Sequence, residues 1–227
     1  HTVSGTLTLP NATAFSAPKL AVTNQVTATA AVTVEVKTAT NTLLALPAVK
    51  TLTVNALGVK TNFSSSSYAA LVTLNIGAAQ GKAPFISTVT NSVTISNGAT
   101  LKTVNITGGD FDTIIINGTT GLTALSTAGE IKDFTLNGAT TLTAATIGHS
   151  HLEGSDAAAF VVTGNTVLAG LTTIALDEVG NIDISNNAAL AAIDLSSLKT
   201  LPILGAYTAT INLNKLSGDF VAATAGA

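Results

Sequence analysis

A repeat of about 20 to 26 residues constrains the fold of this chain more than any other feature of its sequence. Each copy has an aliphatic residue, five residues centred on Asn and Gly, a Leu, and another aliphatic residue three positions further on. The copies occupy residues 95–106, 116–125, 136–147, 162–171 and 184–195. A period of this length predicts one turn of a solenoid per copy, with each coil stacked on its neighbours.

Within the copies, aliphatic and polar residues alternate, as in Val104-Asn-Ile106 and Ile182-Asp-Ile184. Alternation of this kind is typical of a strand with one face on a core and one in water. Before residue 90 the chain shows plainer alternation, as in Val32-Thr-Val34. We therefore predict an all-β fold and a single solenoid domain over residues 1–227, with coils clearest in 92–203 and less regular strands in 1–91.

Two sets of residues recur at fixed offsets, and the repeat assigns each to a column along the solenoid axis. Asn-Gly steps enter positive φ at little energetic cost, so they predict a turn at the same place in each coil. Stacked Asn side chains would hydrogen bond from coil to coil. The expected columns are Leu101, Leu122, Leu142, Leu168 and Leu190, and Asn97, Asn117 and Asn137.

An antiparallel β-sandwich built of Asn-Gly hairpins is the alternative fold. The recurring Leu favours the solenoid, because stacked coils require a residue at one fixed offset and hairpins do not.

Residues 180–201, which read GNIDISNNAALAAIDLSSLKTL, resemble the repeats of the receptor L-domain and related leucine-rich-repeat-like β-helices of surface proteins. The resemblance extends over about half of the chain, from about Ser92 to Ile203. It implies a right-handed solenoid of parallel strands, and right-handed crossover is also the default for such strands. The Thr- and Ala-rich, Cys-free composition resembles bacterial or archaeal surface-layer and appendage proteins.

Composition argues against several classes of partner and chemistry. All nine basic residues are Lys and none cluster, so we expect no nucleic acid partner. No apolar run approaches the roughly 18 to 20 residues of a membrane span. The absence of Cys removes disulfides, thiolate catalysis, zinc–cysteine sites and iron–sulfur clusters. With only 9% charged residues, the chain suits an extracellular, cell-surface location.

Charge is divided unevenly between the two halves of the chain. Residues 1–109 contain six Lys and one acid, a net charge of +5, whereas residues 110–227 contain three Lys and eleven acids, a net charge of −8. In a solenoid, sequence order is spatial order, so this division predicts a dipole along the axis. Unlike ends favour head-to-tail contacts that propagate into filaments or sheets.

These features predict a non-enzymatic, extracellular structural protein, a self-associating subunit of a surface layer or filament. Its expected partners are further copies of itself and, at the cell envelope, glycan. An adhesin or carbohydrate-binding module of a larger surface protein is the alternative. A glycan-cleaving β-helix enzyme is a third hypothesis, which the absence of Arg and the scattered acids disfavour.

Two groups of residues could bind a metal, although no cofactor is expected. Asp110 and Asp112 would lie on one side of an extended segment, as an acid–base pair or a weak calcium site requires. His149, His151 and Glu153 would share one side of a strand, the minimum for a site of two histidines and one carboxylate for another divalent metal. Solvated loops are the alternative explanation for both groups and the one that the sequence favours.

Thr-x-Thr pairs such as Thr51-Leu-Thr53 make ice binding a further hypothesis, because rows of such pairs on a flat solenoid face can order water. We expect no such plane, since the pairs do not recur at one position in consecutive coils and Thr favours strands in any case. The sequence also contains candidate glycan acceptors at Asn11, Asn62, Asn105 and Asn117.

Overall fold

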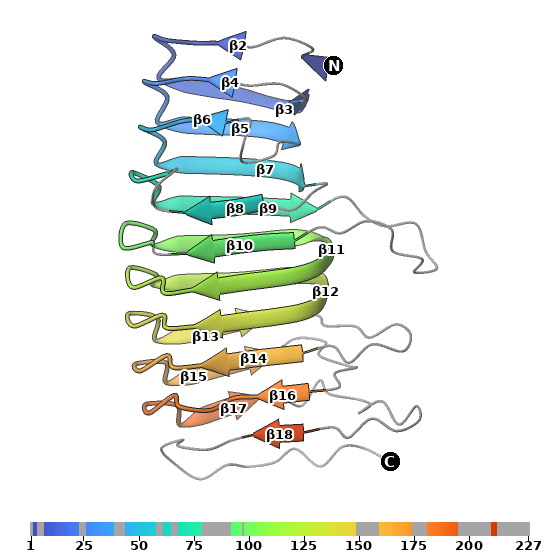
Figure 1. Cartoon of the computed structure of the whole chain (residues 1–227), viewed down its shortest axis with the longest axis vertical. Coiled ribbons are helices and arrows are strands. Elements are labelled where there is room, and N and C mark those ends of the chain that lie inside the picture. The colour runs from blue at the N-terminus through green and yellow to red at the C-terminus, as the bar shows by residue number, and fades with distance from the viewer. Residues whose placement is uncertain are drawn as a thin grey trace.

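The computed structural model describes residues 2–3, 7–22, 26–38, 44–57, 61–64, 68–78, 92–96, 98–148, 159–173, 181–194 and 210–212. Every regular element in these ranges is a strand, and every strand pair is parallel. The strands stack along one axis as a β-solenoid (Figure 1). The predicted all-β solenoid is therefore confirmed, and the alternative antiparallel sandwich is wrong.

One side of the solenoid, here called the first face, is a ladder of strands in sequence order. It consists of β1 (Thr2–Val3), β3 (Ala14–Val22), β5 (Thr33–Thr38), β7 (Thr51–Leu57), β9 (Thr73–Ala78), the first parts of β11 (Thr103–Asn117) and β12 (Ala124–Asn137), β13 (Ala144–Ile147), β15 (Gly170–Thr173) and β17 (Ala192–Asp194). Because each strand pairs with those before and after it, position along the chain is position along the axis.

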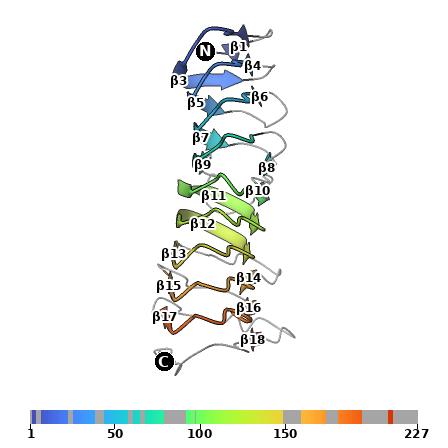
Figure 2. The ribbon, with the colours of Figure 1, turned by 90° about the vertical axis from the view of Figure 1, so that its left-hand side faces the viewer.

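The opposite side, the second face, carries the returning strands (Figure 2). It consists of β8 (Thr61–Ser64), β10 (Ser92–Ser96), the last parts of β11 and β12, β14 (Ala159–Thr163), β16 (Asn181–Asp183) and β18 (Thr210–Asn212). The short strands β2 (Leu7–Thr8), β4 (Val26–Thr27) and β6 (Leu44–Ala45) form a separate sheet on this side. In Figure 1 the chain descends from its N-terminus, runs to the right along the first face at the rear and returns to the left along the second face in front, so the winding is right-handed.

The interior is filled by alternate residues of both faces. In β10, buried Val93 and Ile95 alternate with half-buried polar residues, and Ile95 pairs in register with Ile116 of β11. Further along the second face, the rings of Phe134 and Phe160 stack with their centroids 5.6 Å apart. Burial of these aliphatic and aromatic columns is the main force that holds the coils together.

Glycine forms the corner at which β11 and β12 pass from the first face to the second. Gly108 and Gly109 have φ of 136° and 102°, and Gly129 has φ of 109°. A Cβ on Gly129 would overlap the backbone of Gly109 in the preceding coil. The corner therefore requires residues without a side chain, both for their backbone angles and for the close approach of the two coils.

The other corner is a β-turn at which the chain returns to the first face. Leu122 N–H donates to the carbonyl oxygen of Thr119 at 3.2 Å, and the equivalent bond from Leu71 to Tyr68 measures 3.1 Å. The same turn occurs in coils upstream of residue 92, where the sequence suggested less regular strands. Gly118 and Gly138 adopt φ of 61° and 69° just before this turn, as the Asn-Gly steps predict.

No helix that could cross a lipid bilayer occurs in the part of the chain that the structure describes.

Candidate functional site

The five leucines of the predicted column lie in the interior, at the turn corner. Leu122, Leu142 and Leu168 are fully inaccessible to solvent, and Leu101 and Leu190 nearly so. The residues that follow them are joined from coil to coil, as where Thr123 N–H donates to the carbonyl oxygen of Lys102. The structure thus brings all five leucines into one stacked position.

The asparagines of the predicted ladder are not in the interior. Asn117 and Asn137 pair in register at the ends of β11 and β12, and both side chains are exposed. Asn97 lies outside the described residues. These two asparagines therefore stack on the outside of the coils, because each follows an inward-pointing aliphatic residue and the alternation of the strand turns it outward.

A buried amide ladder exists two positions further into the turn, at Asn165 and Asn187. Both side chains are fully buried, and Asn165 Nδ2 donates to Asn187 Oδ1 at 3.1 Å. Asn165 Oδ1 accepts the backbone N–H of Ala139 at 2.9 Å. Both asparagines precede a column leucine by three residues, and that spacing is the sequence signal that identifies them.

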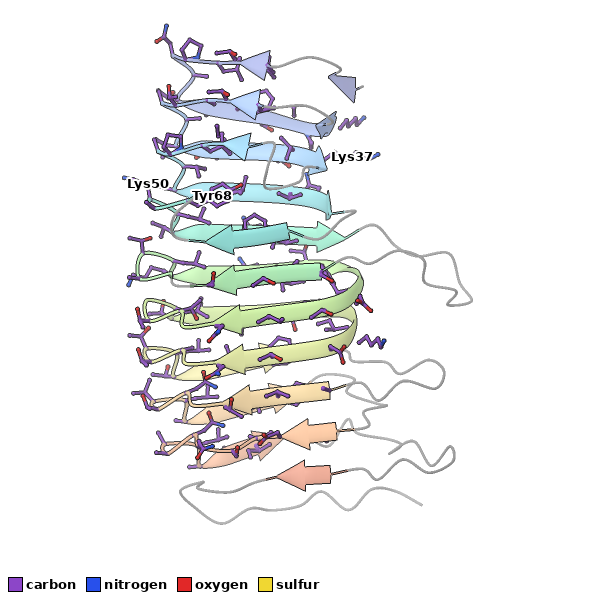
Figure 3. The ribbon with its side chains drawn as sticks, viewed as in Figure 1. Lys37, Lys50 and Tyr68 are labelled. Atoms are coloured by element: carbon purple, nitrogen blue, oxygen red, sulfur yellow. The ribbon has the colours of Figure 1, made fainter. Side chains whose placement is uncertain are left out.

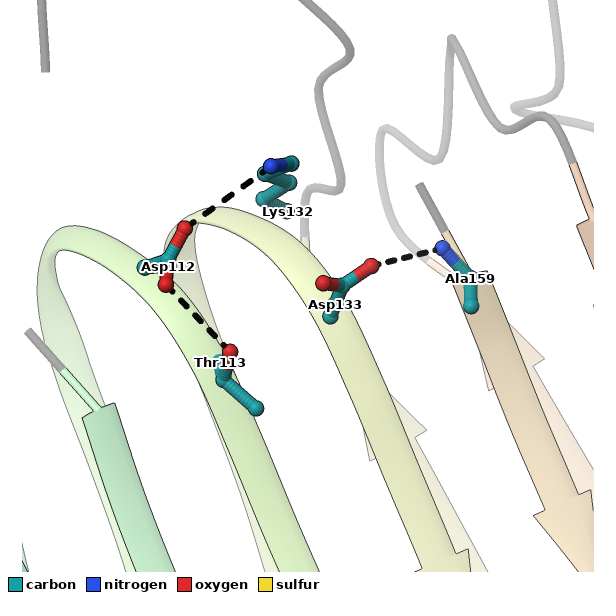
Figure 4. Close-up of polar contacts among 5 residues, drawn as sticks. All are labelled: Asp112, Thr113, Lys132, Asp133 and Ala159. Atoms are coloured by element: carbon teal, nitrogen blue, oxygen red, sulfur yellow. Dashed lines mark hydrogen bonds and ion pairs between the residues drawn. The ribbon is translucent and has the colours of Figure 1, made fainter. Parts of the chain in front are cut away.

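Of the two carboxylates in the predicted pair, the structure describes the side chain of only one. Asp110 lies in β11, and its side chain is outside the described set. Asp112 is half-buried, 3.9 Å from Lys132 Nζ, and its Oδ2 is 3.5 Å from the hydroxyl of Thr113 (Figure 4). Nearby, Asp133 accepts the backbone N–H of Ala159 at 2.9 Å (Figure 4). These contacts tie the carboxylates to neighbouring residues of the stack.

The second predicted metal group, His149, His151 and Glu153, lies outside the described residues. Within the described ranges, no three His, Cys, Asp or Glu side chains come together in a way that could hold a metal ion.

The glycan acceptor candidates differ in their surroundings. Asn11 is exposed, whereas Asn105 is half-buried and its Nδ2 donates to Asn75 Oδ1 at 2.9 Å. Asn117 is exposed, but the hydroxyl-bearing Thr119 of its sequon is fully buried. Asn62 lies in β8, and its side chain is outside the described set.

The N-terminal end of the stack is the first candidate interaction surface. Leu7, Leu9 and Phe15 occupy inward positions but are only partly buried. The residues beneath Leu7 and Phe15 in the next coil, Val26 and Val34, are fully buried. The end therefore presents part of the apolar interior to solvent.

Charged side chains surround the N-terminal half of the stack. Lys19, Lys37, Lys50 and Lys102 are all exposed, with Lys37 and Lys50 at opposite edges (Figure 3). Glu35 lies among them on the first face. Hydrogen bonds from Ser16 Oγ at 2.6 Å and from Asn55 Nδ2 at 3.0 Å hold the pKa of the Glu35 carboxyl below its usual value of 4.5.

The second candidate surface is the outer side of the first face between β7 and β11. Thr51, Thr73 and Thr103 share one outward column, and Thr53, Asn75 and Asn105 share the next. None of these side chains is charged or aromatic, and all are half-buried against their neighbours. The surface formed by these six residues is therefore neutral and regular, and Glu35 of β5 adjoins it at Thr53.

Comparisons of the chain with protein-family models, with curated proteins and with solved structures find no match.

Proposed function

We propose that the chain is an extracellular structural protein of the cell surface whose copies associate head to tail into a filament or layer. The observation that carries this proposal is the partly exposed apolar interior at the N-terminal end. Leu7, Leu9 and Phe15 stand where another coil would bury them. In the proposed assembly, a coil from the C-terminal end of a second copy covers them.

The last described strand of the first face has a matching feature. Ile193 of β17 is partly buried, whereas Leu171, its partner in β15, is 1% exposed. Phe15 and Ile193 are the first and last described members of one inward column of the first face, and a second copy stacked on the N-terminal end would extend this column past Phe15. Burying apolar surface in this way contributes roughly 25 cal/mol per Å² before the cost of association.

Charge favours the same arrangement. The half of the chain that contains β1 to β9 carries net +5, and the half from residue 110 onward carries net −8. Since chain order is axial order, head-to-tail contact places the acidic end of one copy against the basic end of the next. Such a heterologous contact does not close on itself unless its rotation forms a ring, so it propagates.

Strand pairing supplies a third argument. Among the described residues, β1 pairs only with β3, and β2 only with β4. An unpaired strand edge is a template for a strand from another chain. The resemblance of residues 180–201 to receptor L-domain repeats, together with the composition, supports a location at the cell surface.

Concentration-dependent assembly tests this proposal directly. We expect the purified protein to form rods or sheets in negative-stain electron microscopy, and its sedimentation coefficient to rise with concentration. Phe15→Lys should reduce assembly at least tenfold, because it puts a charge into the apolar junction. Thr94→Lys, which adds the same charge on an outward position in the middle of the second face, is the matched control.

High salt should weaken assembly of the wild-type protein, because it screens attraction between unlike ends. A protein that stays monomeric at the highest concentration would contradict the proposal. Phe15→Lys that assembles like Thr94→Lys would contradict the assignment of the junction to the N-terminal end.

A further inference from the structure

We infer that the flat outer side of the first face binds ice. This surface, here called the threonine–asparagine face, is formed by Thr51, Thr53, Thr73, Asn75, Thr103 and Asn105. The inference concerns a different surface from the two ends and does not depend on assembly.

The strand register brings together threonines that are separated by unequal intervals in the sequence. Thr33, Thr51, Thr73 and Thr103 lie in one column on β5, β7, β9 and β11. The sequence led us to expect no recurrence, because whole Thr-x-Thr pairs do not repeat from coil to coil. The structure differs because the first Thr of the motif repeats, while Asn takes the second position in β9 and β11.

The second column is held rigid by hydrogen bonds between coils. Asn105 Nδ2 donates to Asn75 Oδ1 at 2.9 Å, and Asn75 Nδ2 donates to Thr53 Oγ1 at 3.1 Å. Each amide therefore keeps one orientation and leaves its remaining hydrogen-bonding positions available to solvent. Preorganised groups lose little side-chain entropy when they bind.

The two columns form a grid with a regular period in both directions. Neighbouring strands lie about 4.8 Å apart, and alternate residues along a strand about 6.7 Å apart. Each Thr side chain carries a methyl group as well as a hydroxyl, and its β-branching restricts χ1. Beyond β11 the second column continues as Ser126, Thr146 and Thr172, so small neutral residues extend across further coils.

The regular spacing of this grid determines which class of ligand can bind to it. Single hydrogen bonds to such a surface contribute little net free energy, so useful affinity requires many at once. A ligand that offers them must itself repeat over the same area, as an ordered solid does. The six residues of the face carry no charge and no aromatic ring for stacking on a sugar, although Glu35 adjoins Thr53 at the β5 edge. Ordered water therefore fits the six residues better than an ionic mineral or a glycan.

Inhibition of ice recrystallisation and thermal hysteresis test the inference. We expect the wild-type protein to show both, and a fluorescently labelled sample to enrich in a growing ice crystal. Thr73→Tyr puts a bulky ring at the centre of the grid and should raise the inhibitory concentration at least tenfold. Thr135→Tyr makes the same change at a half-buried outward position of the second face and should behave as wild type.

The assay should also be run on Phe15→Lys, so that ice binding and assembly are separated. Activity in this variant with loss of assembly supports two independent surfaces. Circular dichroism melts should confirm that both tyrosine variants are folded. Wild-type protein that is no more active than serum albumin would overturn the inference, as would folded Thr73→Tyr with full activity.

Discussion

Asn165 and Asn187 lie one above the other inside the turn corner, joined by a 3.1 Å hydrogen bond from Asn165 Nδ2 to Asn187 Oδ1. The same Oδ1 accepts the backbone N–H of Asn165 at 2.9 Å, and Asn187 Nδ2 donates to the carbonyl oxygen of Val162 at 2.7 Å. One buried amide therefore satisfies backbone groups of the preceding coil that the corner removes from water.

Replacing Asn187 with Ala should be strongly destabilising, because it leaves the Asn165 amide and the Val162 carbonyl buried without these partners. We expect a loss of about 3 kcal/mol in the free energy of unfolding, measured by urea denaturation. Asn137→Ala removes an exposed Asn and should change stability by less than about 0.5 kcal/mol. Equal effects of the two substitutions would show that the ladder has no stabilising role.

The position of this ladder shows what the sequence can and cannot predict. The leucine column follows from sequence alone, because a buried aliphatic residue recurs at one offset in every clear copy. The Asn ladder does not, since Asn137 and Asn165 differ only in their distance from the following column leucine. The turn decides which Asn is buried: Asn137 directly follows the inward-pointing Leu136, whereas Asn165 comes after the positive-φ Gly164, where the chain has turned back to the interior.

The threonine–asparagine face could not be found from the sequence for a related reason. Its column members are separated by loops of different lengths, so Thr51, Thr73 and Thr103 fall at no constant period. Only the pairing of β7 with β9 and of β9 with β11 places them together. The upstream coils look less regular in the sequence for a similar reason, because Tyr68 stands at the turn position that Asn165 and Asn187 occupy downstream.

Close contact between successive turns predicts the effect of adding a methyl group at Gly121. A Cβ there would overlap the carbonyl oxygen of Ala99 in the preceding coil, whereas a Cβ on Gly170 would meet open space. We expect Gly121→Ala to lower the free energy of unfolding by about 2 to 3 kcal/mol. Gly170→Ala should be neutral or slightly stabilising. Thermal denaturation of the two variants measures the difference, and indistinguishable melts would contradict the tight packing of the turns.

The carboxyl of Glu35 should respond to loss of its hydrogen bond from Ser16. Its pKa is held below 4.5 by Ser16 first and by Asn55 second, so Ser16→Ala should move the pKa upward. Since the folded pKa is depressed, the stabilising contribution of this carboxylate is present above pH 4.5 and is lost as the pH falls through the lower value. NMR titration of the Glu35 side chain gives the shift. Ser126→Ala, further along the same column, should leave the titration unchanged.

The phenol of Tyr68 is buried at the turn corner, with its ring centroid 5.7 Å from that of Phe63. Its hydroxyl is without a hydrogen-bond partner among the described residues, and burial raises its pKa from 10.0 to about 12. Because the folded pKa lies above the unfolded value, the neutral phenol contributes stability that is fully present below pH 10 and is lost as the pH rises through 12.

Tyr68→Phe removes both the ionisable group and the unpaired hydroxyl while keeping the ring. We expect a gain of about 1 kcal/mol in the free energy of unfolding at neutral pH, because no buried donor is left unsatisfied. The variant should also lose less stability than wild type between pH 10 and 12, measured by urea denaturation across that range. Phe63→Leu, which alters the ring contact but keeps the phenol, should retain the alkaline loss. A Tyr68→Phe protein with the wild-type dependence on alkali would mean that another group causes it.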